Sequence, residues 1–282
     1  MSALVTHVNA GNLSGLPTWS GGPRVGDAHY WEAVKTAGYT GVQHYWPENE
    51  AMAAGLTMSG MGRVTAPEAM RPLAAQHKAW GFDATTLHVG TGLETDIEMD
   101  RLAAAVLDAK AAEDYALHIE THRATITQDI RRTLDLLTRF PELTFNADLS
   151  HWYTGHEMPY GDIGAKFAML EPVLARVRFI HGRVGHSCAM QIPLKLAGEV
   201  GSLGHFKALW GRIFALQRQH GETIIFAPEL LPLTVDYGGQ THWLNYAPLT
   251  PDGDRWCEVS DRWVEAIALS QIARDLHANA KV

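Results

Sequence analysis

Four residues that can bind a metal ion recur at regular steps in the second half of the chain. They are Glu120 in HIETHR, Asp148 in FNADLSHW, His181 in FIHGRVGH and Glu229 in APELLP, separated by 28, 33 and 48 residues. One strand–helix unit of a barrel takes roughly 31 residues when about 250 residues are shared among eight units. The first two steps are therefore one unit each, and the third is also one unit if a long loop follows the strand of His181. We expect the four side chains to converge on one pocket.

The chemistry of this set is that of a site for one divalent cation. Three carboxylates and one imidazole form an oxygen-rich donor set, which suits Mn²⁺, Mg²⁺ or Co²⁺ better than the Cys and His sets of structural zinc. We take Mn²⁺ as the first choice and keep Zn²⁺ as an alternative. Singly, each residue could serve a salt bridge or a helix cap. Clustered acids, however, repel one another unless a cation or a proton compensates.

A second group of residues follows the earlier predicted strands and could contact a substrate. His7, His44 and His88 each end such a strand. They could bind substrate hydroxyls or a second cation, or they could be buried histidines with satisfied hydrogen bonds. His118 and His122 alternate along the fifth predicted strand, and we expect the lower-lying His118 to belong to the core.

Aromatic residues near the same face could stack on the apolar face of a sugar or pack in the core. We assign Trp46 to the substrate. The other candidates are Tyr45, Trp152, Tyr153 and Trp243. Both uses stay open, because the sequence does not say which way these rings point.

The elements that must position these residues alternate between short β-type runs and longer helical patterns. This alternation indicates βα units around a parallel sheet. Eight consecutive units of this size indicate closure into a barrel, whereas an open doubly wound sheet usually has about five or six strands. We therefore predict an α/β fold, a single (β/α)8 TIM-barrel domain over residues 1–282. The predicted strands are 3–9, 40–45, 56–60, 82–89, 117–121, 143–148, 178–182 and 223–227.

Helices are predicted over 66–80 and 97–114, where apolar residues recur at three- and four-residue steps. Pro67 fits the first turn of its helix. Two long loops are predicted after the seventh and eighth strands, over 183–204 and 230–260. Both would lie on the C-terminal face of the barrel, where enzymes of this fold keep their active sites, so we expect binding elements or lids there.

Composition narrows the classes of partner. The chain has 46% hydrophobic and 19% charged residues and a formal charge of -8, which disfavours nucleic acid and anionic membranes as partners. A small molecule is the expected partner. Cys188 and Cys257 are expected to be free thiols, since two cysteines form no disulfide framework. No secretory or membrane-spanning segment is evident, and a cytoplasmic location is expected.

These motifs resemble the xylose isomerase-like TIM-barrel superfamily, the sugar phosphate isomerase/epimerase group that includes ketose 3-epimerases, hydroxypyruvate isomerase, inosose dehydratase and endonuclease IV. The resemblance covers essentially the whole chain and implies one cation held by Glu, Asp, His and Glu from strands 5 to 8. Asp148-Leu-Ser-His151 matches the D-x-x-H element of the group, which implies that His151 contacts the substrate. Ketose epimerases also use an arginine after the metal histidine. Arg183 is the nearest candidate, at a shorter spacing, and Arg123 is the alternative.

The resemblance also limits the chemistry. Endonuclease IV carries an Asp-x-His element after the strand-7 histidine, but residues 192–196 read IPLKL here, so a three-metal DNA repair site is not expected. Xylose isomerases move a hydride with two metals and a lysine, and no lysine lies near these strand ends. Proton transfer is expected instead. Barrels of this group often pair, which implies a homodimer or a homotetramer.

We therefore expect a divalent-metal-dependent isomerase or epimerase of a keto-sugar or related polyhydroxy ketone. The carbonyl and an adjacent hydroxyl would chelate the cation and an enediolate would follow. Glu229 and Glu120 would remove and return the proton. Asp148 and His181 would mainly hold the cation, while His151, with one of the two arginines, would stabilise negative charge on oxygen.

Two alternatives remain open at this point. One is a metal-dependent dehydratase or lyase of a keto-cyclitol or 3-dehydroshikimate-like substrate on the same barrel. The other is a non-catalytic sugar-binding or partner subunit.

Overall fold

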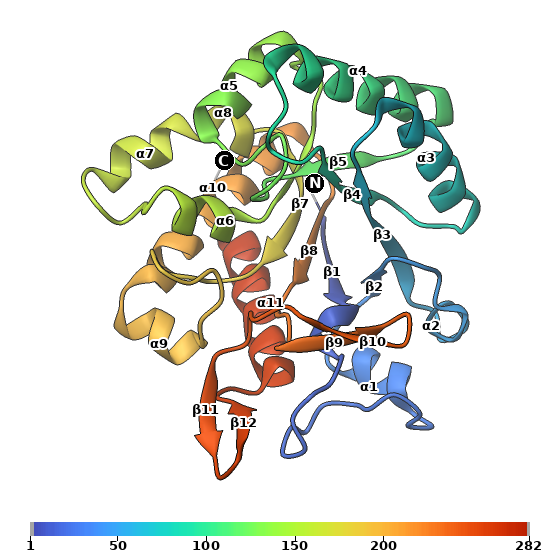
Figure 1. Cartoon of the computed structure of the whole chain (residues 1–282), viewed down its shortest axis with the longest axis vertical. Coiled ribbons are helices and arrows are strands. Elements are labelled where there is room, and N and C mark those ends of the chain that lie inside the picture. Colours follow the sequence, from blue (N-terminus) through green and yellow to red (C-terminus); the bar gives the residue numbers. More distant parts are fainter. Residues whose placement is uncertain (1–2, 281–282) are drawn as a thin grey trace.

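Eight parallel strands close into a barrel, which confirms the predicted fold class (Figure 1). The computed structural model describes residues 3–280 of the chain. Each strand pairs with its neighbour in sequence, and the pairing of Leu4 with Ile224 closes the barrel between the first and the last strand. The strands are β1 (Leu4–Asn9), β2 (Gly41–His44), β3 (Thr57–Val64), β4 (Thr85–Val89), β5 (Leu117–Glu120), β6 (Phe145–Ala147), β7 (Val177–Gly182) and β8 (Ile224–Pro228).

Helices surround the barrel and fill every connection between its strands (Figure 1). The α-helices are α1 (Tyr30–Thr36), α2 (Asn49–Ala53), α3 (Met70–Ala79), α4 (Asp96–Glu113), α5 (Ile130–Arg139), α6 (Leu149–Gly155), α7 (Ile163–Met169), α8 (Glu171–Leu174), α9 (Leu194–Glu199), α10 (Ser202–His220) and α11 (Arg262–Asn279). Short 3-10 helices lie at η1 (Ala10–Asn12) and η2 (Pro67–Ala69).

The predicted element boundaries hold with local corrections. The helix predicted over 66–80 begins as η2, with Pro67 in its first turn as expected, and continues as α3. The helix predicted over 97–114 is α4, which Thr95 and Glu98 start with a reciprocal pair of side chain–backbone hydrogen bonds. Strand β3 continues four residues beyond its predicted end at residue 60, because Gly60 and Gly62 leave no side chain where His77, Thr85 and Leu73 pack.

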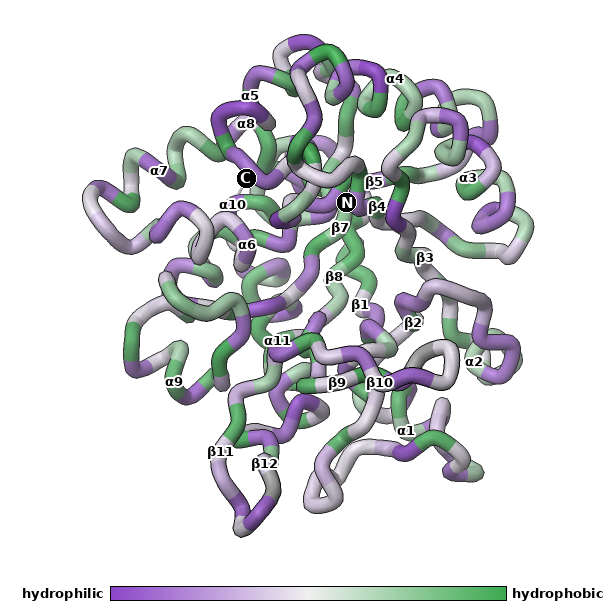
Figure 2. The backbone as a smooth tube through the Cα atoms, in the orientation of Figure 1, coloured by the Kyte–Doolittle hydropathy of each residue, from purple (hydrophilic) through white to green (hydrophobic). Residues whose placement is uncertain are grey.

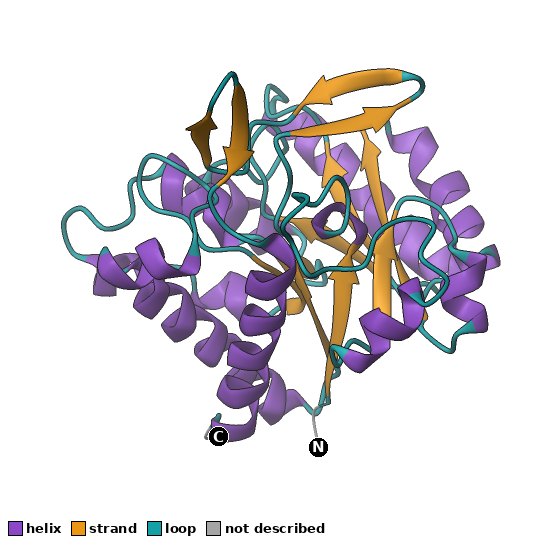
Figure 3. Ribbon diagram, turned by 90° about the horizontal axis from the view of Figure 1, so that it is seen from below, coloured by secondary structure: helices purple, strands orange, loops and turns teal. Residues whose placement is uncertain are grey.

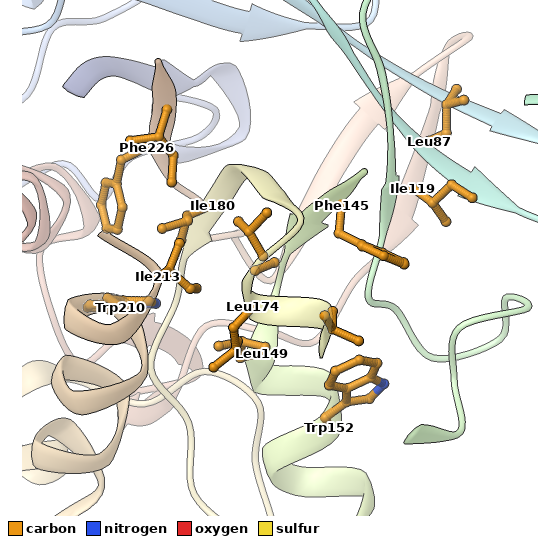
Figure 4. Packing of buried hydrophobic residues seen from close by; sticks show 14 of the residues in the cluster. Leu87, Ile119, Phe145, Leu149, Trp152, Leu174, Ile180, Trp210, Ile213 and Phe226 are labelled. Carbon is orange, nitrogen blue, oxygen red and sulfur yellow. The ribbon is translucent and has the colours of Figure 1, made fainter. Parts of the chain in front are cut away.

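Alternation along the strands separates an inner and an outer packing layer. Inside the barrel, Phe179, Ile225 and Ala227 pack together. Outside it, Phe226 of β8 packs edge-on against Trp210 of α10, with ring centroids 5.3 Å apart (Figure 4). Hydrophobic residues concentrate on β1, β7 and β8 at the centre of the molecule (Figure 2). The same two-residue period that faces Phe179 inward also faces His181 inward at the end of its strand.

The two connections predicted as long loops contain structure of their own. Residues 183–204 include α9 and the start of α10. Residues 230–260 fold into two antiparallel hairpins, formed by β9 (Thr234–Tyr237) with β10 (Gln240–Trp243) and by β11 (Leu249–Asp252) with β12 (Arg255–Glu258). Both hairpins lie at the end of the barrel toward which the strand arrows point, away from the two termini (Figure 3). They therefore flank the face on which an active site was predicted.

Two expectations about the rest of the chain can also be compared with the structure. Cys188 and Cys257 are both free thiols, as predicted. Among residues 3–280, no helix combines the length and the apolar character needed to cross a membrane.

Buried neutral histidines should make the barrel sensitive to acid. Burial lowers the pKa of His7 to about 3, and burial, followed by the nearby charges of Lys110 and Arg178, lowers the pKa of His118 to about 3. An unfolded histidine has a pKa of about 6.5, so the unfolded chain binds more protons between these values and stability is lost as the pH falls through that window. Near pH 5 the two residues together should lower the free energy of unfolding by about 3 kcal/mol per pH unit.

Urea unfolding at pH 7, 6 and 5 measures this slope. His118→Gln should reduce it by about one bound proton, or about 1.4 kcal/mol per pH unit, whereas a matched change of the exposed His220 to glutamine should not. An unchanged slope in His118→Gln would show that this residue is not held neutral in the fold.

Candidate active site

The four residues predicted to share a cation do converge at the C-terminal end of the barrel. Glu120 ends β5, Asp148 follows β6, His181 lies near the end of β7 and Glu229 follows β8. All four are buried, and one potential ligand atom from each lies within 4.8 Å of the others. His181 Nδ1 is 3.4 Å from Glu120 Oε2 and 3.3 Å from Glu229 Oε2. These separations are those of neighbouring ligands around one small cation, whose bonds to such atoms are about 2.0–2.2 Å long.

The hydrogen bonds of His181 leave one ring nitrogen available to a cation. Gln43 Nε2 donates to Thr86 and Asn9 Nδ2 donates to Gln43 Oε1, so Gln43 Oε1 must accept from His181 Nε2, which lies 2.9 Å away. The neutral ring then has its lone pair on Nδ1. Within the described part of the chain, that buried Nδ1 has no hydrogen-bond partner, and it faces carboxylate oxygens of Glu120 and Glu229. This ring nitrogen and the oxygen-rich donor set fit a divalent cation.

Amide side chains orient two of the candidate carboxylates. Asn146 Nδ2 donates to Glu120 Oε2 over 3.0 Å, and Asn9 Nδ2 lies 3.3 Å from Glu229 Oε1. Partners of this kind hold metal ligands in place in known sites. Asn9, Gln43 and Asn146 were not predicted, although each occupies an inward-facing position near the end of a strand.

Arg183 lies inside the cluster rather than at its entrance. Its guanidinium is fully buried, and Nη2 donates to Asp148 Oδ2 and, over 2.8 Å, to Glu229 Oε2. Burial alone would raise the pKa of Asp148, but the charge of Arg183, followed by that of His151, outweighs burial and holds this pKa well below its usual range. Three carboxylates and one guanidinium leave a formal charge of −2, which is the charge that one divalent cation neutralises.

A proton on His181 can compensate part of the carboxylate charge that a cation would otherwise neutralise. Burial alone would lower the pKa of His181, but the carboxylates of Glu229 and Glu120 outweigh burial and raise this pKa to about 10. Without a cation the imidazole would therefore carry a proton at neutral pH, and a cation would have to displace it.

A column of three imidazoles, whose rings are in contact and tilted against one another, borders the cluster. The ring centroids of His88 and His122 are 4.0 Å apart, and those of His122 and His151 are 3.9 Å apart. His88 Nε2 lies 3.2 Å from Glu120 Oε1, and Arg63 Nη2 lies 3.2 Å from His88 Nδ1. Because arginine can only donate, His88 Nδ1 accepts and the neutral ring carries its proton on Nε2, facing Glu120.

This tautomer bears on the second cation that the sequence left open. His88, Glu120 and His122 also form a cluster with the spacing of metal ligands. A nitrogen that carries a proton is no ligand, however, so the geometry favours His88 as a residue that orients Glu120.

His151, predicted to contact substrate, is the member of the imidazole column that lies next to Arg183. Its Nε2 is 3.3 Å from Arg183 Nη2 and 3.4 Å from Asp148 Oδ2. Among the described residues, the buried atoms His151 Nδ1 and Arg183 Nη1 have no hydrogen-bond partner. Both atoms are therefore free to donate to a bound molecule, which is compatible with the predicted substrate contacts of His151 and Arg183.

Residues of the entrance come from loops. Arg123, the alternative substrate arginine, follows β5, and its Nη2 donates to the hydroxyl of Tyr246 over 3.1 Å. The ring of Tyr246 lies 4.8 Å from the guanidinium carbon of Arg183. Tyr246 belongs to the segment between the two hairpins, so the connection after β8 covers the cluster as a binding element would. Sequence reasoning placed a functional loop there but did not single out Tyr246.

The remaining predicted substrate residues divide between the interior of the barrel and the end of β2. His7 is fully buried in the barrel, and its two ring nitrogens bond to hydroxyls of Ser59 and Thr57. This is the buried alternative that the sequence left open. His44 ends β2 and packs edge-on against Trp46 of the following connection, with ring centroids 4.2 Å apart, and its Nδ1 lies 3.7 Å from Glu48 Oε1.

The other aromatic candidates divide between core and surface. Trp152 and Tyr153 are buried, and Trp152 Nε1 donates to the Thr127 carbonyl over 2.7 Å, so both belong to the core. Trp243 is exposed on β10. Among these five aromatic residues, Tyr45 is the one whose hydroxyl has its pKa raised by the charges of Glu229 and Glu120, after the larger effect of burial. His118 belongs to the core, as expected, with Nδ1 2.8 Å from the Thr144 hydroxyl.

Comparison with known proteins defines the type of barrel. No family model matches the sequence, and no curated protein matches it. A xylose isomerase-like TIM-barrel protein from Mycobacterium smegmatis, solved in complex with magnesium, matches with a TM-score of 0.55 and 13% identity over 100% of this chain and 98% of that one. This chain shares the TIM-barrel fold of that protein. The probable 3-DHS dehydratase AsbF of Bacillus anthracis, involved in petrobactin synthesis, matches with a TM-score of 0.50 and 11% identity, over 81% of this chain and 92% of AsbF.

Proposed function

We propose that this protein is a divalent-metal-dependent isomerase or epimerase of a keto-sugar or related polyhydroxy ketone. The observation that carries the proposal is the convergence of Glu120, Asp148, His181 and Glu229 with an unpartnered imidazole nitrogen among three carboxylates. Mn²⁺ is the cation we propose first, and Mg²⁺ is supported by the fold neighbour that was solved with magnesium. Co²⁺ and Zn²⁺ remain alternatives to both.

Different residues of the site would transfer the proton and stabilise the negative charge that develops on oxygen. When bound, a divalent cation would polarise a carbonyl and make the neighbouring C–H more acidic. Glu120 ends β5 and Glu229 follows β8, and two strands of the barrel separate β5 from β8, so the carboxylates approach the pocket from different sides. One can remove a proton and the other can return it. His151 Nδ1 and Arg183 Nη1 are free to donate to an oxygen on which negative charge develops.

A lyase on the same barrel is the second candidate. The fold neighbour AsbF is a probable 3-DHS dehydratase, and dehydration of a keto-cyclitol or a 3-dehydroshikimate-like compound could begin with the same proton removal. The two reactions differ in whether a hydroxyl is then expelled. Mass spectrometry of the product separates them, because dehydration makes the product lighter by one water.

Metal analysis combined with a solvent-deuterium exchange screen tests the proposal. The purified protein should contain or bind about one divalent cation per chain, and in D₂O it should incorporate deuterium next to the carbonyl of a keto-sugar or keto-cyclitol. The screen covers free and phosphorylated compounds. Binding without turnover and without cation would instead indicate a non-catalytic sugar-binding or partner subunit, and isomerisation without deuterium uptake would indicate hydride transfer.

A further inference from the structure

Two guanidinium groups at the entrance of the site have no acidic partner. Arg63 lies on β3 and Arg123 follows β5, and both side chains are exposed. Among residues 3–280, no ion pair includes either of them. Arg139 and Arg212, also exposed, pair with Asp100 and Glu171, whereas Arg131 resembles Arg63 and Arg123 in having no ion pair among these residues.

The charge of the interior does not account for these two arginines. Glu120, Asp148 and Glu229 are balanced by Arg183 and one divalent cation, which leaves a net formal charge of zero. His88 adds no charge, because its ring is neutral and its Nδ1 accepts a hydrogen bond from Arg63. Arg63 and Arg123 therefore contribute a charge of +2 to the entrance once a cation is bound, although the whole chain carries −8.

Contacts connect Arg63 both to the loop of Arg123 and to the metal-ligand cluster. Arg63 Nη1 donates to the carbonyl of Ala124, the residue after Arg123, over 3.3 Å. Arg63 Nη2 lies 3.2 Å from His88 Nδ1, and His88 Nε2 lies 3.2 Å from Glu120 Oε1. The charge of Arg63 is thus one imidazole ring away from a proposed proton-transfer carboxylate.

Hydroxyl groups complete the opening. Arg123 Nη2 donates to the hydroxyl of Tyr246. The phenol of Tyr45, which directly follows β2 at the same end of the barrel, keeps its proton at neutral pH and can donate. Guanidinium groups beside hydroxyl donors form the usual environment of a bound carboxylate or phosphate.

We infer that the substrate of this pocket carries a carboxylate or phosphate group, which Arg63 and Arg123 bind at the entrance while the keto end reaches the metal-ligand cluster. This assignment adds the charge of the substrate to the proposed function. It rests on the proposed function only for the keto group and its reaction. It narrows the substrate class from neutral keto-sugars to anionic ones.

Binding measurements with matched probes test the inference. Isothermal titration calorimetry on the Mg²⁺-loaded protein would compare neutral D-fructose with D-fructose 6-phosphate and with 5-keto-D-gluconate, which carries a carboxylate. Inorganic phosphate is a fourth probe, and ionic strength is held constant with NaCl. At least one anionic probe should bind about tenfold or more tightly than D-fructose, the lower end of what hydrogen bonds between charged groups contribute. The two anionic sugars distinguish a phosphate from a carboxylate.

Variants locate the bound anion. Arg123→Gln and the double variant Arg63→Gln/Arg123→Gln should each weaken anion binding about tenfold or more and leave the weak binding of D-fructose unchanged. Arg131→Gln is the matched control, since Arg131 is an exposed arginine on α5 whose side chain, among residues 3–280, bonds to Met169 Sδ and to no acidic group.

Three results would overturn the inference: no anion binds, anions bind no more tightly than D-fructose, or the variants bind anions as the wild type does. If the variants bind anions as the wild type does, the anion binds to the metal cation instead of to the two arginines. Failure of the proposed function looks different, because anions would bind as expected while no deuterium enters any compound of the screen.

Discussion

Replacing Glu229 by glutamine should slow turnover by at least about a hundredfold while the barrel still folds, because a general acid or base contributes roughly 10²–10⁴ in rate. The amide has the shape of the carboxylate and can still accept a hydrogen bond from Arg183 Nη2, which lies 2.8 Å from Glu229 Oε2. It cannot take up a proton. It also removes one of the charged groups that would hold the cation.

The measurement must separate loss of the base from loss of the cation. Deuterium exchange would be followed by NMR at saturating Mn²⁺ or Mg²⁺, with cation content measured on the same sample. Glu258→Gln is the matched control, because Glu258 lies in the same connection after β8 and pairs with Arg262 instead of with the site. Near-normal exchange in the cation-loaded Glu229→Gln protein would remove Glu229 from the mechanism.

The barrel and the four candidate ligands could be predicted because both leave periodic signals in the sequence. A buried parallel strand is a short apolar run, and a strand-end acid such as Glu120 interrupts the pattern at the position where the active site of a barrel lies. The spacing of one unit then brings Asp148 and His181 beside it. Neither step requires knowledge of side-chain orientation.

The supporting residues could not be predicted, because their roles depend on directions that spacing does not contain. Asn9 and Gln43 are neutral amides, which are common at many positions, and only the closed barrel brings Gln43 of β2 within 2.9 Å of His181 on β7. Tyr246 lies in a connection without periodicity, so its approach to Arg183 has no sequence signal. His7 of β1 illustrates the converse case, since both of its ring nitrogens bond to hydroxyls of β3 on the far side of β2.

For Arg183, the structure indicates a different role from the substrate contact that the sequence suggested. The resemblance assigned it to the substrate, whereas its guanidinium lies between Asp148 and Glu229 and is buried with them. Its charge partly compensates the acidic cluster in the absence of a cation. Removal of one partner from a buried ion pair costs about 3–5 kcal/mol, because the remaining charge has no compensation.

Arg183→Met should therefore destabilise the metal-free protein by about 3–5 kcal/mol, and excess Mn²⁺ should narrow this difference. Without the guanidinium the cluster has a formal charge of −3, so a divalent cation compensates more charge in the variant than in the wild type and binding to the folded state stabilises it more. Arg183→Lys, which keeps the charge but not the two-pronged geometry, should lose less stability.

Urea unfolding is measured with a chelator and with excess Mn²⁺ on the wild type and both variants. It gives the stability difference between each variant and the wild type under each of the two conditions. A stability gap between wild type and Arg183→Met that stays constant on adding Mn²⁺ would mean that guanidinium and cation do not share the same carboxylates. A gap that widens would mean that Arg183 mainly orients Asp148 and Glu229 for the cation, because the variant would then bind the cation less tightly than the wild type. A gap that narrows follows only if the charge of Arg183 and the charge of the cation act on one acidic cluster.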